Sequence, residues 1–300
     1  MADLTPARRT TLLATLALLG ITATWGSTFF LIKDLLDRVP TLDFLGVRFA
    51  IAAVALVVLS PRALGRLSRT ARRQAVVLGL LYGFGQILQT AGLAHTPASV
   101  SGFITGLYVV ATPLFAAVLL KLRITRLTWG AVLLAVAGLG VLTLDGLSVG
   151  YGEALTFVAA MLYALHIVGL GAWSDREQAM GLATLQLIAV AAVCLVATAP
   201  GGVVLPDRTS DWLSMLYMAL IPGALAIVGQ TWAQAHLPPT RTAIVMSMEP
   251  VFAAFFAVLL GGESLTSRML FGGALVLTAM LVVELAPRRK LEGEVTHLTV

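Results

Sequence analysis

Long apolar stretches alternate with short polar segments along the whole chain of 300 residues. Residues 74–120 contain no Asp, Glu, Lys or Arg. A helix rises about 1.5 Å per residue, so that about 20 residues cross a bilayer. This stretch is therefore predicted to form two membrane spans, with a turn at His95-Thr96-Pro97.

The same pattern continues on both sides of this stretch. It predicts ten spans, at residues 11–32, 42–59, 75–94, 98–120, 127–144, 154–173, 180–199, 212–235, 242–261 and 269–286. The first span follows Arg8 and Arg9 as a signal peptide would, but its length and Lys33 at its end favour an uncleaved span. The sequence thus predicts an all-α polytopic membrane protein with ten transmembrane helices.

Composition supports this class. Hydrophobic residues make up 58% and charged residues 12% of the chain, whereas soluble domains carry about 25% charged residues. Such a chain cannot cover itself with a water-facing surface.

The positions of the basic residues predict the orientation. If the N-terminus is cytoplasmic, the cytoplasmic segments hold fifteen Lys and Arg residues and the opposite segments hold four. Cytoplasmic loops are enriched in Lys and Arg, so both termini are expected in the cytoplasm, with residues 1–10 and 287–300 as cytoplasmic ends. These basic residues are then expected to face anionic lipids. The net charge of +5 therefore does not indicate a nucleic-acid partner.

The two halves of the chain resemble each other. PLFAA at 113–117 matches PVFAA at 250–254, and Ala94-His95 matches Ala235-His236. Residues 11–146 and 147–286 would each hold five spans, an odd number, so the two copies are expected in opposite orientations. Inverted repeats of this kind place a substrate site near the membrane midplane, where the halves meet.

Three segments carry a family resemblance: WGSTF at 25–29 with Lys33 after it, LGVRFAIAA at 45–53, and MEPVFAAFFAVLLGGESLT at 248–266. Over about residues 12–286 the chain resembles an EamA-type transporter of the drug/metabolite transporter superfamily. The first half departs from the family, because KLRITR at 121–126 replaces the usual Gly-Glu loop. The resemblance implies ten helices around a central cavity, alternating access, and substrates that range from amino acids to drugs.

Glu249 and Pro250 are the most unusual residues of the apolar runs. Pro250 has no N–H, so the carbonyl of Met246 loses its helical partner. Such a carbonyl is tolerated within a membrane only where it faces protein or a water-filled cavity. Glu249 is then expected inside the bundle, either as a structural partner of the kink or as a group for proton coupling or substrate binding.

Arg48 is the other charge within a span. Three interpretations remain open: its side chain extends to the outer surface, pairs with a carboxylate or backbone group, or meets an anionic group of the substrate.

Uncharged polar side chains complete the set of cavity candidates. Tyr82, Gln86 and Gln89 recur on one face of their helix, which fits a substrate site or, equally, contacts between helices. The other candidates are Trp25, Tyr108, Tyr163, His166, Trp232 and Gln230, the last at the position that repeats Gln89. For each aromatic residue, packing is the competing interpretation.

No cofactor is predicted. The sequence contains no metal-binding cluster and no ATP-binding loop, and its single cysteine, Cys194, cannot form an intrachain disulfide. The predicted function is a secondary transporter and exporter of small metabolites, amino acids or drugs in the cytoplasmic membrane, not an enzyme. Protons are a candidate coupling ion. A membrane enzyme, a lipid flippase or a scaffold are the alternatives, and the sequence does not decide between a monomer and a homodimer.

Overall fold

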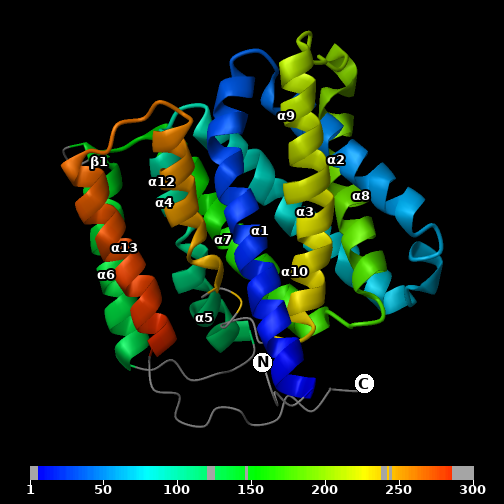
Figure 1. The fold of residues 1–300 in the computed structure, drawn as a ribbon, viewed down its shortest axis with the longest axis horizontal. Helices are drawn as coiled ribbons and strands as arrows, with labels where there is room; N and C mark the ends of the chain where they lie inside the picture. The colour runs from blue at the N-terminus through cyan, green and yellow to red at the C-terminus, as the bar shows by residue number, and fades with distance from the viewer. Residues whose placement is uncertain (1–5, 120–125, 146–147, 238–241, 243–244, 286–300) are drawn as a thin grey trace.

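Long helices run side by side and form the fold (Figure 1). The computed structural model describes residues 6–119, 126–145, 148–237, 242 and 245–285. Its α-helices are α1 (Pro6–Leu36), α2 (Thr41–Leu59), α3 (Arg69–Leu93), α4 (Ala98–Thr105), α5 (Tyr108–Leu119), α6 (Arg126–Thr143), α7 (Tyr151–Trp173), α8 (Ala179–Thr198), α9 (Thr209–Ala219), α10 (Ala226–Gln234), α12 (Glu249–Leu259) and α13 (Ser267–Leu285). Short 3₁₀ turns lie at Leu64–Arg66 and Ala199–Gly201, and a π-helical turn lies at Leu220–Leu225.

Seven helical stretches of the described chain are long and apolar enough to cross a membrane. Three shorter apolar helices, Trp129–Leu142, Glu249–Leu259 and Ser267–Ala279, overlap further predicted spans. Many large hydrophobic side chains on the outward faces stay exposed, among them Val58 at 73% and Leu133 at 70%. In a bundle of this composition such faces contact lipid, and the chain is a multi-pass membrane protein.

One departure from the all-α prediction is a pair of two-residue strands. β1 (Leu144–Asp145) pairs antiparallel with β2 (Ser148–Val149), in the segment between α6 and α7. It joins two helices and leaves the helical character of the bundle unchanged.

Three of the predicted spans are interrupted. The span at 98–120 breaks between α4 and α5 at Gly106 and Leu107, and the span at 212–235 widens into the π turn around Pro222. The span at 242–261 has a turn at residues 247–248, and α12 begins only at Glu249. The break at Pro250 was predicted, because a proline cannot donate to the preceding turn. The other two interruptions were not.

α12 packs against both α1 and α4 (Figure 1). Glycines allow this close approach. A Cβ atom added to Gly26 of α1 would lie 2.5 Å from Phe252 Cβ and 2.8 Å from Ala253 N, and one added to Gly102 of α4 would lie 2.6 Å from Ala253 Cβ. Both helices therefore contact α12 nearly backbone to backbone.

This packing predicts that Gly26→Ala destabilises the protein by about 1–3 kcal/mol, because the new methyl group meets backbone atoms that cannot move aside. Gly20→Ala is the matched control on the same helix, since nothing lies within 4 Å of its added Cβ. Thermal unfolding of the purified protein in detergent measures both variants. Equal melting temperatures for the two variants would contradict the close contact between α1 and α12.

Candidate functional site

A cavity lies in the interior of the bundle, with about 510 Å³ of space that no protein atom fills, its opening to solvent included. Helices from both halves of the chain contribute to its wall. The lining residues are Trp25, Thr28, Phe29, Ile32, Arg48, Tyr82, Gln86, Gln89, Thr105, Tyr108, Tyr163, His166, Ile167, Gln230, Met246 and Glu249.

Arg48 of α2 is buried in this wall and only 2% exposed. Its Nε donates a hydrogen bond to the carbonyl of Met218 at 3.1 Å. Pro222 follows Met218 by four residues and has no N–H to offer that carbonyl, so Arg48 occupies the acceptor that the proline leaves. The guanidinium carbon lies 5.0 Å from the ring centroid of Phe49 and 5.8 Å from that of Phe44.

One guanidinium nitrogen of Arg48 lacks a hydrogen-bond partner in the described structure. Nη1 is buried without a hydrogen bond, and neither of the ion pairs found among the described residues includes Arg48. The side chain does not extend to the surface, which excludes the first sequence interpretation. A buried cation without a counter-charge is unfavourable, so this position is suited to an anionic group that enters the cavity.

A directed chain of hydrogen bonds crosses the cavity wall. Gln86 Nε2 donates to the hydroxyl of Tyr163 at 2.8 Å, and that hydroxyl donates to Gln89 Oε1 at 2.8 Å. Gln89 Nε2 then donates to the hydroxyl of Thr105 at 2.9 Å. These bonds fix α3, α7 and α4 relative to one another, and they leave Gln86 Oε1 as a buried acceptor without a partner. Gln86 thus combines a contact between helices with a free oxygen at the cavity.

His166 and Tyr82 form a second part of the wall. His166 Nε2 lies 2.8 Å from Gln186 Oε1, and since that oxygen can only accept, Nε2 carries the hydrogen. The imidazole ring lies 5.2 Å from the ring of Tyr82, which in turn lies 5.8 Å from the ring of Tyr163. His166 is therefore a hydrogen-bonded side chain of the cavity wall.

Glu249 of α12 and Tyr108 of α5 are in direct contact in the interior of the bundle. The Tyr108 hydroxyl lies 2.9 Å from Glu249 Oε2 and 2.8 Å from the carbonyl oxygen of Met246. Glu249 is 5% exposed and Tyr108 is 1% exposed. The Met246 carbonyl is the one that Pro250 leaves without a helical donor. Pro250 itself is buried but does not line the cavity.

Trp25 and Gln230 lie at the cavity with one polar contact each. Trp25 Nε1 donates to the carbonyl of Pro222 in the π turn at 2.7 Å. Gln230 Nε2 lies 3.9 Å from the sulfur of Met246, and Gln230 Oε1 is buried without a partner.

The structure brings together nearly all of the predicted cavity residues. Trp232 is the exception, because it does not line the cavity and packs on His236 with ring centroids 4.8 Å apart. Sequence reasoning missed Thr28 and Thr105. Both are small and helix-compatible, and the Thr28 hydroxyl donates to a carbonyl of its own helix, so neither stands out in an apolar run.

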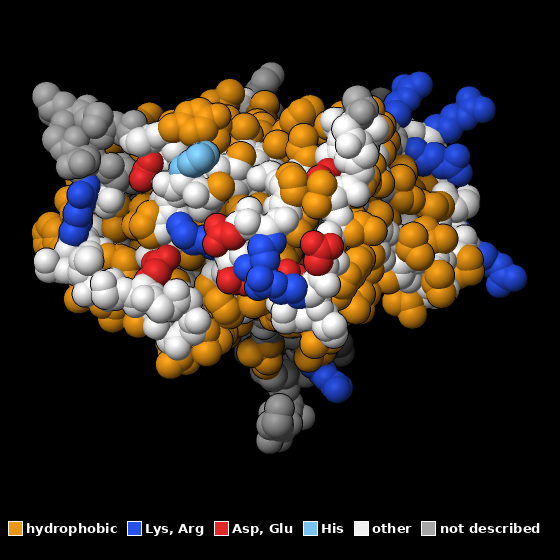
Figure 2. All heavy atoms as spheres, turned by 90° about the horizontal axis from the view of Figure 1, so that it is seen from above, with side chains coloured by type: hydrophobic (Ala, Val, Ile, Leu, Met, Phe, Trp, Pro, Cys, Tyr) orange, Lys and Arg blue, Asp and Glu red, His pale blue; other side chains and the backbone are white. Residues whose placement is uncertain are grey.

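Polar contacts close one end of the bundle, the end that is uppermost in Figure 1, where α1 ends and α9 begins. Figure 2, which views this end from above, shows acidic and basic side chains side by side near its middle. Lys33 Nζ donates to the carbonyl of Thr96 at 2.5 Å, and the carboxylate of Glu263 accepts from Ala98 N at 2.6 Å and from the hydroxyl of Ser99. We call this end the upper end.

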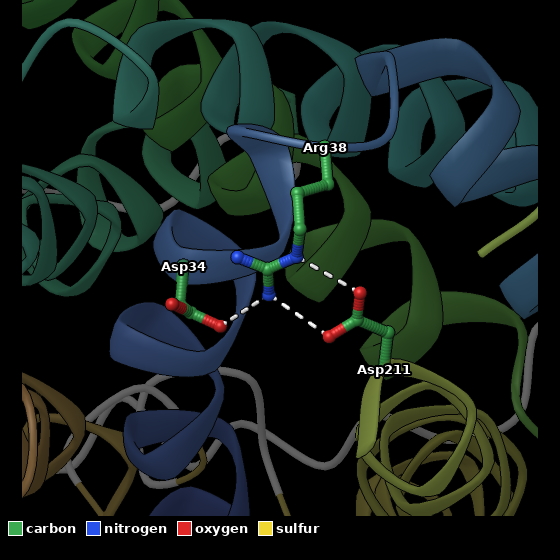
Figure 3. Close-up of polar contacts among 3 residues, drawn as sticks. All are labelled: Asp34, Arg38 and Asp211. Carbon is green, nitrogen blue, oxygen red and sulfur yellow. Dashed lines mark hydrogen bonds and ion pairs between the residues drawn. The ribbon is translucent and has the colours of Figure 1, made fainter. Parts of the chain in front are cut away.

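Arg38 makes two ion pairs at the upper end (Figure 3). Its Nε and Nη2 each donate to Asp211 at 2.9 Å, and Nη2 also contacts Asp34 at 2.6 Å. The hydrogen bonds to Asp211 and Asp34 hold the pKa of Arg38 above its ordinary value. The side chain of Asp211 is only 5% exposed, whereas that of Asp34 is 70% exposed. This pair could not be predicted from the sequence, because 173 residues separate its members.

Arg38→Gln should therefore open the upper end more often. Hydrogen bonds to charged groups contribute about 1.5–3 kcal/mol, which corresponds to a rise of about 10- to 100-fold in opening. The rate at which a membrane-impermeant thiol reagent, added on the upper side, labels a cysteine at Thr28 measures this opening. Asp34→Asn is the control, because an exposed pair at this spacing contributes only about 0.3–0.5 kcal/mol. A labelling rate in Arg38→Gln equal to that of the unchanged protein would show that Arg38 does not hold this end closed.

The described residues include no group of three or more His, Cys, Asp or Glu that could hold a metal ion. The site therefore consists of hydrogen-bonding groups, aromatic rings, one buried arginine and one buried glutamate.

Membrane-spanning helices around an interior polar cavity are typical of membrane transport proteins. The family model of the EamA-like transporters matches residues 12–144 and 150–285, and the chain belongs to this family. The resemblance seen in the sequence is confirmed, and the chain is a membrane transporter. The family and the names of its relatives point to transport and not to enzymatic catalysis.

Two relatives and one solved structure illustrate the similarity. An uncharacterized transporter of Archaeoglobus fulgidus is 29% identical over 91% of this chain and 86% of its own. A probable terminal-alkyne amino-acid exporter of Streptantibioticus cattleyicolor is 26% identical over 89% of this chain and 92% of its own. A crystal structure with a TM-score of 0.70 and 18% identity covers 93% of this chain and 98% of its own chain, and it supports the fold alone.

Proposed function

We propose that this protein is a secondary transporter that exports small zwitterionic molecules of the amino-acid class, by alternating access to the central cavity. One observation carries the proposal: the cavity is lined by a buried glutamate and by a buried arginine that has no acidic partner among the described residues. A carboxylate of the substrate would bind Arg48. Its ammonium group would bind among acceptors, of which Glu249 and the unpartnered oxygens of Gln86 and Gln230 line the same space.

A named relative supports this substrate class. The relative from Streptantibioticus cattleyicolor carries the name of an amino-acid exporter, and its similarity extends over most of both chains. Aromatic rings of the cavity, such as those of Tyr82 and Trp25, would pack on an apolar side chain of the substrate.

The proposed architecture is ten transmembrane helices in two inverted repeats, residues 11–146 and 147–286. Packing supports it, because α2 contacts α8, α4 contacts α12, and α6 contacts α13. Each of these contacts joins helices at corresponding positions of the two halves, as a two-fold axis between the repeats requires. The two separate stretches matched by the family model give further support.

The proposed orientation places both termini in the cytoplasm and the upper end outside. Fifteen basic residues against four support it, as counted along the sequence. The polar contacts of the upper end then form an outer closure, which must open to release substrate.

Proton exchange at Glu249 is the proposed source of energy. Glu249 is a buried carboxyl at a helix break, where one half of a transporter can bend against the other. Buried ionisable groups of this kind mark proton pathways in membrane transporters. Uptake of an outside proton by Glu249 would accompany the release of substrate.

Counterflow by the purified protein in liposomes tests the proposal. Liposomes loaded with one unlabelled amino acid at a time should accumulate the same amino acid in labelled form from outside. Analogues of that amino acid without the carboxylate or without the ammonium group should not compete with its uptake. If no zwitterion supports counterflow while a cationic or neutral drug does, the proposed substrate class is wrong.

A further inference from the structure

The hydroxyl of Tyr108 takes the place of the hydrogen-bond donor that Pro250 lacks. In an unbroken helix the N–H of residue 250 would bond to the carbonyl of Met246. Here the Tyr108 hydroxyl, which comes from α5, donates to that carbonyl at 2.8 Å. Met246 is 2% exposed, so that water does not readily replace this donor.

The same hydroxyl also contacts Glu249, and it has only one hydrogen to give. Glu249 Oε2 lies 2.9 Å away. If Glu249 is protonated, its carboxyl donates to Tyr108 and Tyr108 donates to Met246, so that all three groups are satisfied. If Glu249 is ionised, its carboxylate only accepts. Two acceptors then compete for one hydrogen, and the charged one is the stronger.

The other ionisable groups of the cavity do not relieve this competition. They come from the neighbouring helices: Arg48 from α2, Tyr82 from α3, and Tyr163 and His166 from α7. Arg48 donates to Met218, Tyr163 donates to Gln89, and His166 is bonded to Gln186. Tyr108 is the hydrogen-bond partner that the described structure gives to the Glu249 carboxyl.

The corresponding position of the first half contains no ionisable group. Pro113 aligns with Pro250, and Thr112 stands where the second half has Glu249. The Thr112 hydroxyl donates to the carbonyl of Tyr108 at 2.7 Å. The two halves thus share a proline, but only the second half pairs it with an acid.

We propose that Tyr108 couples the protonation of Glu249 to the helix break at Pro250. The inference rests on the proposed function, in which Glu249 binds and releases a proton. When Glu249 releases its proton to water in the cavity, the hydrogen of Tyr108 moves from Met246 to the carboxylate. The Met246 carbonyl loses its donor, and the turn before α12 takes up water and bends. Tyr108 is a positioning residue, since its role is to transmit the state of Glu249 to the backbone.

Cysteine labelling at Ser247 tests the coupling. Ser247 lies in the turn and is 3% exposed. In full-length Cys194→Ala, Ser247→Cys protein in liposomes, labelling by a water-soluble maleimide should rise about tenfold as pH is raised, the size expected when a buried carbonyl loses its donor. Rates are normalised to a cysteine at Thr70, which is exposed in the first turn of α3 and corrects for ionisation of the thiol.

Two variants should hold the turn before α12 in opposite states, one bonded to Tyr108 and one without this donor. Glu249→Gln keeps a donor for Tyr108 at every pH, so labelling should stay low. Tyr108→Phe removes the donor to Met246 at every pH, so labelling should stay high. Pro250→Ala restores an N–H for Met246, and when added to Tyr108→Phe it should return labelling to the low level. This rescue separates the coupling from a general loss of folding.

The possible failures are distinguishable. If labelling responds to pH and Glu249→Gln abolishes the response, but Tyr108→Phe retains it, Tyr108 does not couple the two and the proton role of Glu249 stands. If labelling does not respond to pH in the unchanged background, the coupling is wrong, and gradient-driven transport by Glu249→Gln then decides whether the proton role of Glu249 stands.

Discussion

Replacing Glu249 by Gln should abolish transport driven by a pH gradient while substrate exchange continues. The amide has nearly the same shape as the protonated carboxyl and still donates to Tyr108, but it cannot release a proton. Accumulation against a gradient should fall to the background of empty liposomes. Exchange of labelled for unlabelled substrate, which needs no net proton movement, should continue, because the amide oxygen of this variant still accepts a hydrogen bond from the ammonium group of the substrate.

Pro250→Ala is the comparison for this variant. It keeps the carboxyl and restores the missing N–H, so that the turn before α12 bends less readily. Gradient-driven transport and exchange should therefore slow together. Measurements in liposomes under an imposed pH gradient decide the matter. If Glu249→Gln accumulates substrate as the unchanged protein does, Glu249 is only a structural partner of the helix break.

Replacing Arg48 by Met should weaken the binding of zwitterionic substrates by about 30-fold or more. Truncation of one member of a buried charge pair costs about 2–5 kcal/mol, and about 1.4 kcal/mol corresponds to a factor of ten. Met fills a similar volume between the rings of Phe44 and Phe49 but offers no donor to a carboxylate.

A pair of ligands provides the control. An amine that lacks the carboxylate should bind Arg48→Met about as well as it binds the unchanged protein, because it has no group for Arg48. Equilibrium binding of the amino acid and of its decarboxylated analogue gives both values. A loss of equal size for the two ligands would mean that Arg48 only supports Met218 and the π turn.

Polar residues in apolar helices were the most predictable part of the site. The cost of exposing Arg48, Gln86 or Glu249 to lipid directs them to the interior, so their position in the sequence already places them at the cavity. Trp232 carries no such cost, since an indole ring is stable at lipid, at protein or at an interface. Its place against His236 depends on packing that hydropathy does not report.

Breaks and long-range pairs were less predictable. The missing N–H of Pro250 predicts its break, whereas Gly106, which follows the last residue of α4, carries no such signal, because glycines are also common where membrane helices pack closely. Gly102, four residues earlier, does pack closely on Ala253. Arg38 and Asp211 both lie near loops, where water could solvate either charge. Only the arrangement of the helices brings the two side chains into contact.

Access to one cavity residue from the two sides of the membrane tests the central claim most directly. Thr28 lines the cavity and is 6% exposed, whereas Thr22 on the same helix is 0% exposed and does not line it. In Cys194→Ala protein of known orientation in liposomes, a cysteine at Thr28 should react with an impermeant maleimide added on either side, and bound amino acid should protect it. A cysteine at Thr22 should react from neither side. If the cysteine at Thr28 reacts from one side only, with and without substrate and gradient, the cavity is not alternately accessible and the account is wrong.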